Sequence, residues 1–189
     1  MKTIRFKKLV FIAFIVLLFI SGCGSSQMKT AANKKMTVNK DLVKSPKIGD
    51  TVVVGKMVYK VNKVHTTAQV GPDSQVGPSV LPLKAKGKYV VINVTVKNNG
   101  DDSVVLKDNF LKLKKGKKMF DTDSKASLTA NLDKNQHIKN FYNQNLLPGN
   151  KATINIVFDV APSVASSPNL LLQAQEGVSG MHSALIDLK

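Results

Sequence analysis

Two segments of this chain alternate apolar and polar residues with a period of two. In residues 88–97, one face would carry Val90, Ile92, Val94 and Val96, and the other Asn93, Thr95 and Lys97. In residues 151–160, one face would carry Ile154, Ile156, Phe158 and Val160, and the other Thr153, Asn155, Val157 and Asp159. Such alternation is typical of a strand that is buried on one face only. We therefore expect two core strands of an antiparallel sheet.

Shorter strand-like segments surround these two. They are residues 51–54 and 57–65 joined at Gly55, then 104–106, 110–113, 119–120, 170–174 and 184–188. Turn signals separate them, among them residues 98–101 (NNGD) and 148–150 (PGN). No long segment shows the 3.6-residue period of an amphipathic helix. Residues 48–189 therefore predict an all-β, immunoglobulin-like antiparallel β-sandwich.

The stretch from Gln69 to Lys86 is predicted to be a long surface loop. It contains Pro72, Pro78 and Pro82 with several Gly and Ser residues. Long loops are either functional elements, which here could order on binding, or disordered insertions. The sequence leaves both interpretations open.

The first 22 residues have the layout of a lipoprotein signal peptide. A basic segment, Met1 to Lys8, precedes twelve apolar residues, Leu9 to Ile20, which would span about 18 Å as a helix. That length is short of the roughly 30 Å of a hydrocarbon core, so a permanent transmembrane anchor is not expected. Ile20-Ser21-Gly22-Cys23 resembles the bacterial lipobox, which implies cleavage between Gly22 and Cys23 and a diacylglyceryl group on the cysteine. The alternative is an ordinary signal peptide followed by an incidental cysteine.

The net charge of +16 is almost entirely due to lysine. Of 28 basic residues only Arg5 is an arginine, whereas specific nucleic-acid readers depend on the bidentate fork of arginine. Four positive charges lie in the signal peptide. Residues 23–47 form a lysine-rich segment with no aromatic residue, which we interpret as a flexible, lipid-anchored linker. The lysines of this linker would either bind anionic lipid at the membrane surface or only keep the segment soluble. Export, lysine bias and few aromatics argue against nucleic acid as a partner.

Candidate catalytic or metal-binding residues are sparse. The three histidines, His65, His137 and His182, are dispersed, and would form a zinc site only if the fold brought them together. Asp121 and Asp123 begin like a calcium loop, but Lys125 stands where an oxygen ligand is needed. The single glutamate, Glu176, lies in a turn-like segment. We expect no cofactor and no enzymatic activity. The alternative is an envelope hydrolase or metal-dependent enzyme with an Asp/His site.

One local concentration of charge is present. Six lysines surround a predicted hairpin over residues 111–119: Lys107, Lys112, Lys114, Lys115, Lys117 and Lys118. They could contact an anionic polymer, a lipid or an acidic protein. The alternative is that they protect a solvated strand edge from aggregation.

Several segments resemble one family of bacterial surface domains. They are residues 87–100 (GKYVVINVTVKNNG), residues 110–113 with Gly116 and Phe120, and residues 147–149 with 154–160 and Pro162. The chain resembles the DUF4352 domains of Gram-positive lipoproteins over roughly residues 48–188. The resemblance implies an immunoglobulin-like sandwich, akin to that of a secreted mycobacterial antigen, and no reaction. We therefore expect a binding or accessory module, lipid-anchored on the extracytoplasmic face of the cell membrane, whose partner is an envelope protein or an anionic cell-wall polymer.

Overall fold

The computed structural model describes residues 45–71, 82–132, 145–177 and 181–189. The signal peptide, Cys23, the linker up to residue 44 and His137 lie outside these residues. Among the described residues, no helix is long and apolar enough to cross a membrane.

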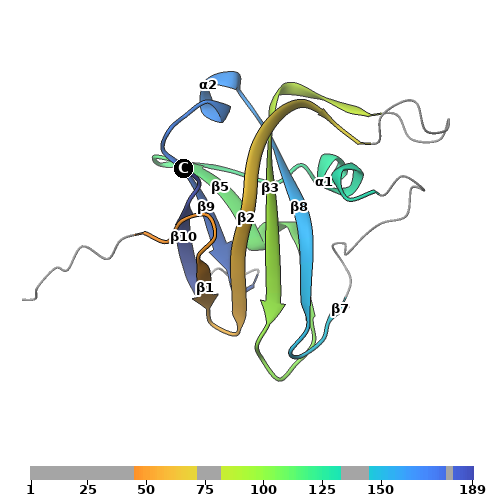
Figure 1. Cartoon of the computed structure of the whole chain (residues 1–189), viewed down its shortest axis with the longest axis vertical. Helices are drawn as coiled ribbons and strands as arrows, with labels where there is room; N and C mark the ends of the chain where they lie inside the picture. Colours follow the sequence, from red (N-terminus) through yellow and green to blue (C-terminus); the bar gives the residue numbers. More distant parts are fainter. Residues whose placement is uncertain (1–44, 72–81, 133–144, 178–180) are drawn as a thin grey trace, which may run out of the picture. The chain divides into compact units, whose positions relative to one another are not determined.

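The first sheet contains the two strands with the clearest alternation. Its order is β1 (Thr51–Val54), β2 (Met57–Val70), β3 (Leu83–Asn98) and β8 (Lys151–Val160), and all neighbours are antiparallel. β1 and β2 are joined by a tight turn in which Gly55 adopts a left-handed conformation, with φ +57°. β2 and β3 form a long hairpin whose distal ends bend toward helix α1 (Ser124–Ala130) (Figure 1).

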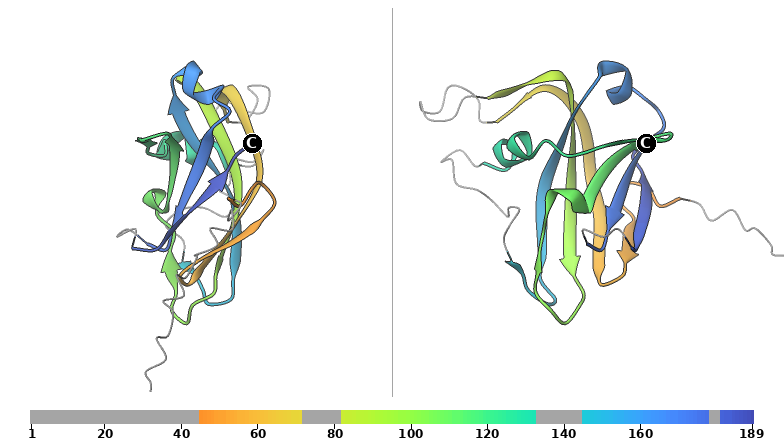
Figure 2. Two further views of the ribbon diagram at one scale, coloured as in Figure 1. Left: turned by 90° about the vertical axis from the view of Figure 1, so that its left-hand side faces the viewer. Right: turned by 180° about the vertical axis from the view of Figure 1, so that it is seen from behind.

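The second sheet packs against the first (Figure 2). Its order is β10 (Ser183–Asp187), β9 (Leu170–Gln175), β5 (Leu111–Lys115) and β6 (Lys118–Phe120). A separate pair is formed by β4 (Val104–Val105) and β7 (Asn145–Leu146). Two short elements, η1 (Asp108–Phe110) and α2 (Pro162–Ala165), complete the described chain. The predicted all-β antiparallel sandwich is confirmed.

The core lies between the inner faces of the two sheets. The predicted inward residues of β3 and β8 are 0–4% exposed, and they pack with Tyr59, Leu113, Leu172 and Ile186. Burying each large apolar side chain stabilises the fold by about 1.5–3 kcal/mol. The alternation therefore identified the buried face of both strands correctly.

The outer face of β8 departs from the prediction at Val157. This residue was expected to face solvent, yet it is completely buried. It belongs to a second, smaller core with Val70, Tyr89, Val91 and Ala126, the last contributed by α1. A helix of seven residues is too short to produce a clear 3.6-residue period, so the sequence pattern did not reveal it.

The predicted loop over residues 69–86 is wrong at both ends. Gln69 pairs with Lys84 and Val70 with Leu83, so β2 and β3 extend into the segment. The extension is favourable because Val70 and Leu83 pack in the second core. Only residues 72–81, at the tip, lie outside the described part of the chain.

A β-bulge in β2 changes which side chains face outward. The register shifts between Val61 and Lys63, so that Val61 pairs with Val94 but Lys63 pairs with Asn93. Such an extra residue reverses the alternation beyond it. Asn62 and Lys63 therefore both lie on the outer face of the first sheet.

Candidate functional site

The predicted lysine hairpin is formed by β5 and β6. Lys115 pairs with Lys118 across a two-residue turn whose first residue, Gly116, has φ +57°. Leu111 and Leu113 face the core, which turns Lys112 and Lys114 to the outer face of the second sheet. Lys107 precedes η1 and is not part of the hairpin.

Two of the hairpin lysines already have partners within the domain. The ammonium group of Lys112 forms an ion pair with Asp121 at 2.8 Å. Lys115 donates to the carbonyl oxygen of Ser163 at 2.9 Å. Lys114, Lys117 and Lys118 form no ion pair within the described residues, and the last two are exposed. The charge available to a partner is therefore concentrated at the hairpin tip.

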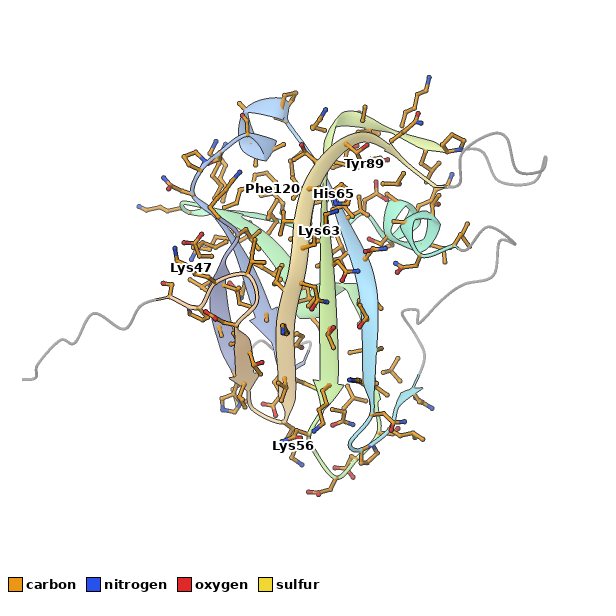
Figure 3. The ribbon with its side chains drawn as sticks, viewed as in Figure 1. Lys47, Lys56, Lys63, His65, Tyr89 and Phe120 are labelled. Carbon is orange, nitrogen blue, oxygen red and sulfur yellow. The ribbon has the colours of Figure 1, made fainter. Side chains whose placement is uncertain are left out.

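The two histidines within the described residues, His65 and His182, do not converge. His182 pairs with Glu176, whose carboxylate also accepts the backbone N–H of Lys56, just before β2 begins. His65 lies eight residues after the start of β2, roughly 26 Å away at the rise of a strand. Figure 3 shows Lys56 at the turn before β2 and His65 far along the strand from it. Two groups that far apart cannot act together as an acid–base pair or as metal ligands.

The two acidic residues of the predicted calcium loop, Asp121 and Asp123, have structural partners. Asp123 is the N-cap of α1, where its carboxylate accepts the N–H of Ala126 at 2.9 Å, and Asp121 pairs with Lys112. An N-cap carboxylate stabilises the first turn of a helix, so capping explains why an aspartate stands at position 123 and no calcium ion needs to be invoked. Within the described ranges, no group of three or more His, Cys, Asp or Glu side chains could hold a metal ion.

A shallow depression of about 380 Å³ lies beside His65. Its walls include Gln69 and Val70 from β2, Asn155 from β8 and Ala130 from α1. Partial burial, with the nearby charge of Lys63, lowers the pKa of His65, so the neutral imidazole is favoured. The depression thus offers hydrogen-bonding groups and a neutral ring.

Next to the depression, beginning at Asn155, the outer face of the first sheet carries rows of hydrogen-bonded polar side chains. Asn62 donates to Asn93 Oδ1 and to Thr95 Oγ1, both at 2.9 Å. Asn93 donates to Asn155 Oδ1 at 2.8 Å, and the hydroxyls of Thr95 and Thr153 are 2.9 Å apart. These contacts hold three amides and two hydroxyls in fixed orientations across three strands.

The sequence pattern does not single out this polar surface. Alternation places Asn93, Thr95, Thr153 and Asn155 on the outward faces of two strands. It does not indicate which residues lie opposite one another, because that depends on the register of β3 and β8. The bulge that turns Lys63, next to Asn62, to the same outer face was not anticipated either.

The described chain is an antiparallel β-sandwich whose polar surfaces present hydrogen-bonding groups and lysines. The model of the family "Domain of unknown function (DUF4352)" matches residues 46–181. The chain belongs to the DUF4352 family. A comparison with curated proteins finds no match.

Solved structures with a similar fold come from several bacteria. The yjhA protein of Bacillus subtilis is 20% identical, with a TM-score of 0.53, over 76% of this chain and 99% of its own. A conserved hypothetical protein of Bacillus anthracis is 14% identical, with a TM-score of 0.54, over 74% of this chain and 94% of its own. The secreted protein MPT63 of Mycobacterium tuberculosis has a TM-score of 0.48 at 15% identity, over 76% and 95% of the two chains. The two Bacillus structures support the sandwich fold.

Proposed function

We propose that this chain is a non-enzymatic binding module, lipid-anchored through Cys23 on the extracytoplasmic face of the cell membrane, which contacts an anionic polymer of the envelope. The observation that carries the proposal is the β5–β6 hairpin, whose tip presents Lys114, Lys117 and Lys118. A folded envelope protein with an acidic surface is the alternative partner.

The anchor is supported by the position of the only cysteine. Cys23 directly follows the apolar segment and the small residues Ser21 and Gly22. Two acyl chains give durable membrane attachment, whereas one gives only marginal binding. The segment between Cys23 and the first described residue would act as a tether with a root-mean-square span of about 25 Å if flexible.

The binding role is supported by the distribution of charge in the hairpin. Residues 111–120 contain five lysines and no acidic residue. The exposed tip lysines lie on a rigid two-stranded element that is joined to β9 by backbone pairing. A fixed cluster of like charge attracts polyanions more strongly than the same charges scattered over a surface.

Replacing the anchor residue tests the first part of the proposal. We expect Cys23→Ala to abolish palmitate labelling and the processed, membrane-bound form of the protein. Cys23→Ser is the second variant, because it retains the size of the side chain. Labelling that persists in either variant would exclude lipidation at this residue.

Neutralising the hairpin tests the second part. Full-length protein in neutral detergent is titrated with poly(glycerol phosphate), comparing Lys114→Gln/Lys117→Gln/Lys118→Gln with a control that carries the same charge change. The control replaces the exposed residues Lys47, Lys84 and Lys125 by Gln. With about 1 kcal/mol for each lysine near an anionic surface, the hairpin variant should bind at least tenfold more weakly than the control. Equal binding by the two variants would remove the hairpin from the proposal.

A further inference from the structure

The open part of the outer face of the first sheet is strongly basic. Four lysines project from it at outward register positions of β2, β3 and β8: Lys60, Lys63, Lys97 and Lys151. Lys60, Lys63 and Lys151 are exposed, and Lys97 is half-buried. None of the four pairs with a carboxylate in the described part of the chain. Figure 3 shows Lys63 on this face, on the same stretch of β2 as His65.

The single acid on the outward positions of these three strands does not neutralise the lysines. Asp159 lies opposite Tyr89, toward the end of the face that carries the second core. Its two carboxylate oxygens accept the backbone N–H groups of Lys86 and Gly87, at 2.7 and 3.0 Å. The region around Thr95 and Thr153 therefore remains positive.

One pair of these lysines is unfavourable for the fold. Lys97 lies directly opposite Lys151 in the β3–β8 register, and both point outward. Like charges in directly opposite positions destabilise an antiparallel pair, whereas threonines in the next outward row, Thr95 and Thr153, form a favourable pair. The sheet itself gains nothing from the lysine pair, but a bound anion between the two ammonium groups would relieve the repulsion.

The polar rows add a second kind of recognition next to the lysines. The amide of Asn62 uses both of its N–H groups within the row, whereas its Oδ1 accepts no hydrogen bond from the described residues and keeps its acceptor capacity. The hydroxyls of Thr95 and Thr153 share one hydrogen bond, so further donor and acceptor capacity remains. A flat surface with fixed amides and hydroxyls, bordered by ammonium groups, complements a chain that carries both hydroxyl and phosphate groups.

We infer that the outer face of β2, β3 and β8 is a second binding surface, for a phosphodiester-linked polyol or sugar polymer. The lysines bind the phosphates as point charges, and the amide and threonine rows bind the hydroxyls between them. This surface lies on the sheet opposite the β5–β6 hairpin. The inference shares its polymer class with the proposed function but depends on different residues.

The test compares three triple variants of the full-length protein in neutral detergent, titrated with poly(glycerol phosphate). The face variant is Lys60→Gln/Lys97→Gln/Lys151→Gln; the hairpin variant and the Lys47/Lys84/Lys125 control are those defined above. We expect the face variant to bind at least tenfold more weakly than the control, while its stability equals or exceeds that of the wild type because the Lys97–Lys151 repulsion is gone. Face-variant binding equal to the control would overturn the inference. If only the hairpin variant binds more weakly, the hairpin site of the proposed function stands and the second surface is refuted. If only the face variant binds more weakly, the second surface stands and the hairpin site is refuted.

A second measurement separates hydroxyl recognition from charge attraction. Thr153→Val and Asn62→Ala change exposed side chains and leave the charge unaltered. We expect each to weaken binding of poly(glycerol phosphate) about threefold or more and to leave binding of poly-L-glutamate, which lacks hydroxyls, unchanged. Equal effects on both polymers, or on neither, would refute the role of the polar rows.

Discussion

The carboxyl group of Glu176 occupies the space that a side chain on Gly55 would need. A Cβ atom built on Gly55 would lie far inside van der Waals contact with the carboxyl carbon of Glu176. The same carboxylate accepts the N–H of Lys56 at 2.8 Å and contacts Nδ1 of His182 at 2.5 Å. The only glutamate of the chain thus connects the β1–β2 turn of one sheet to the β9–β10 connection of the other.

This arrangement predicts that Gly55→Ala is unusually destabilising. Gly55 and Gly116 both have φ +57°, so alanine at either position carries the same backbone strain, about 1 kcal/mol. Gly116 has nothing within 4 Å of an added Cβ, whereas Gly55 faces Glu176. We expect Gly55→Ala to lower the free energy of unfolding by at least about 1 kcal/mol more than Gly116→Ala, measured by urea denaturation.

A double variant identifies the source of that difference. Removing the carboxyl group with Glu176→Ala should make the additional Gly55→Ala change cost no more than Gly116→Ala does. A full cost that persists without the carboxyl group would mean that the strain is in the backbone alone.

The same carboxylate predicts a loss of stability in acid. The hydrogen bond from the Lys56 N–H, followed by that from His182, lowers the pKa of Glu176 below its ordinary 4.5. A depressed pKa in the folded state contributes stability above the unfolded value, and this contribution is lost as the pH falls through the folded value. The stability difference between wild type and Glu176→Gln should therefore be constant just above pH 5 and shrink below pH 4.5. Asp101→Asn, at an exposed residue without an ion pair among the described residues, is the control. A difference independent of pH would contradict this role.

Tyr59 predicts a loss of stability in alkali. Its ring is completely buried, and its hydroxyl donates to the carbonyl oxygen of Gln175 at 2.5 Å. Burial, with the nearby Glu176, raises the pKa of Tyr59 far above its usual value of 10. The stability that depends on the neutral hydroxyl is complete below pH 10 and is lost as the pH rises further, because the unfolded chain then ionises.

Tyr59→Phe measures this contribution directly. Near neutral pH the variant should be about 1–2 kcal/mol less stable, because the carbonyl oxygen of Gln175 loses a buried donor. The gap should narrow above pH 10 in urea unfolding. In absorbance titration at 295 nm, wild type and variant should coincide while both remain folded. An additional tyrosinate step in the folded wild type would contradict the assignment.

Short-range alternation was sufficient to predict the core-facing residues of the two central strands. Val90, Ile92, Val94 and Val96 of β3 and Ile154, Ile156, Phe158 and Val160 of β8 were placed correctly, because a strand whose inner face is buried leaves a local period-two pattern. The β5–β6 hairpin was likewise predicted from two apolar segments around Gly116. The seven-residue α1 was missed, and Val157 was therefore placed in solvent although α1 helps to bury it.

The candidate surfaces were predictable only in part. The lysines of the hairpin lie within seven residues of one another in the sequence, so the sequence alone shows that they cluster. Lys97 and Lys151 are far apart in sequence and meet only through the β3–β8 register. Lys63 lies on the same face because a bulge reverses the alternation of β2 beyond Val61. Register and bulges depend on packing between strands, which local patterns do not contain.

The edge of β8 that no other described strand covers is capped by the side chain of Asn131, which forms hydrogen bonds with its backbone. Asn131, just after α1, accepts the N–H of Asn155 at 2.9 Å and donates to its carbonyl oxygen at 2.7 Å. Ser127 accepts the N–H of Val157 at 2.9 Å, and both side chains are buried. Unpaired strand edges recruit other chains, so this capping should oppose aggregation.

Asn131→Ala should therefore reduce both stability and solubility. Two backbone groups of Asn155 lose their partners, which costs about 2–4 kcal/mol in the free energy of unfolding. Asn62→Ala, which removes an exposed amide from the same sheet, should cost less than about 1 kcal/mol. Urea denaturation measures the stability, and light scattering at rising protein concentration measures association, which should appear only with Asn131→Ala. Similar losses in the two variants, or an Asn131→Ala protein that stays monomeric at all concentrations, would show that the β8 edge does not depend on this side chain.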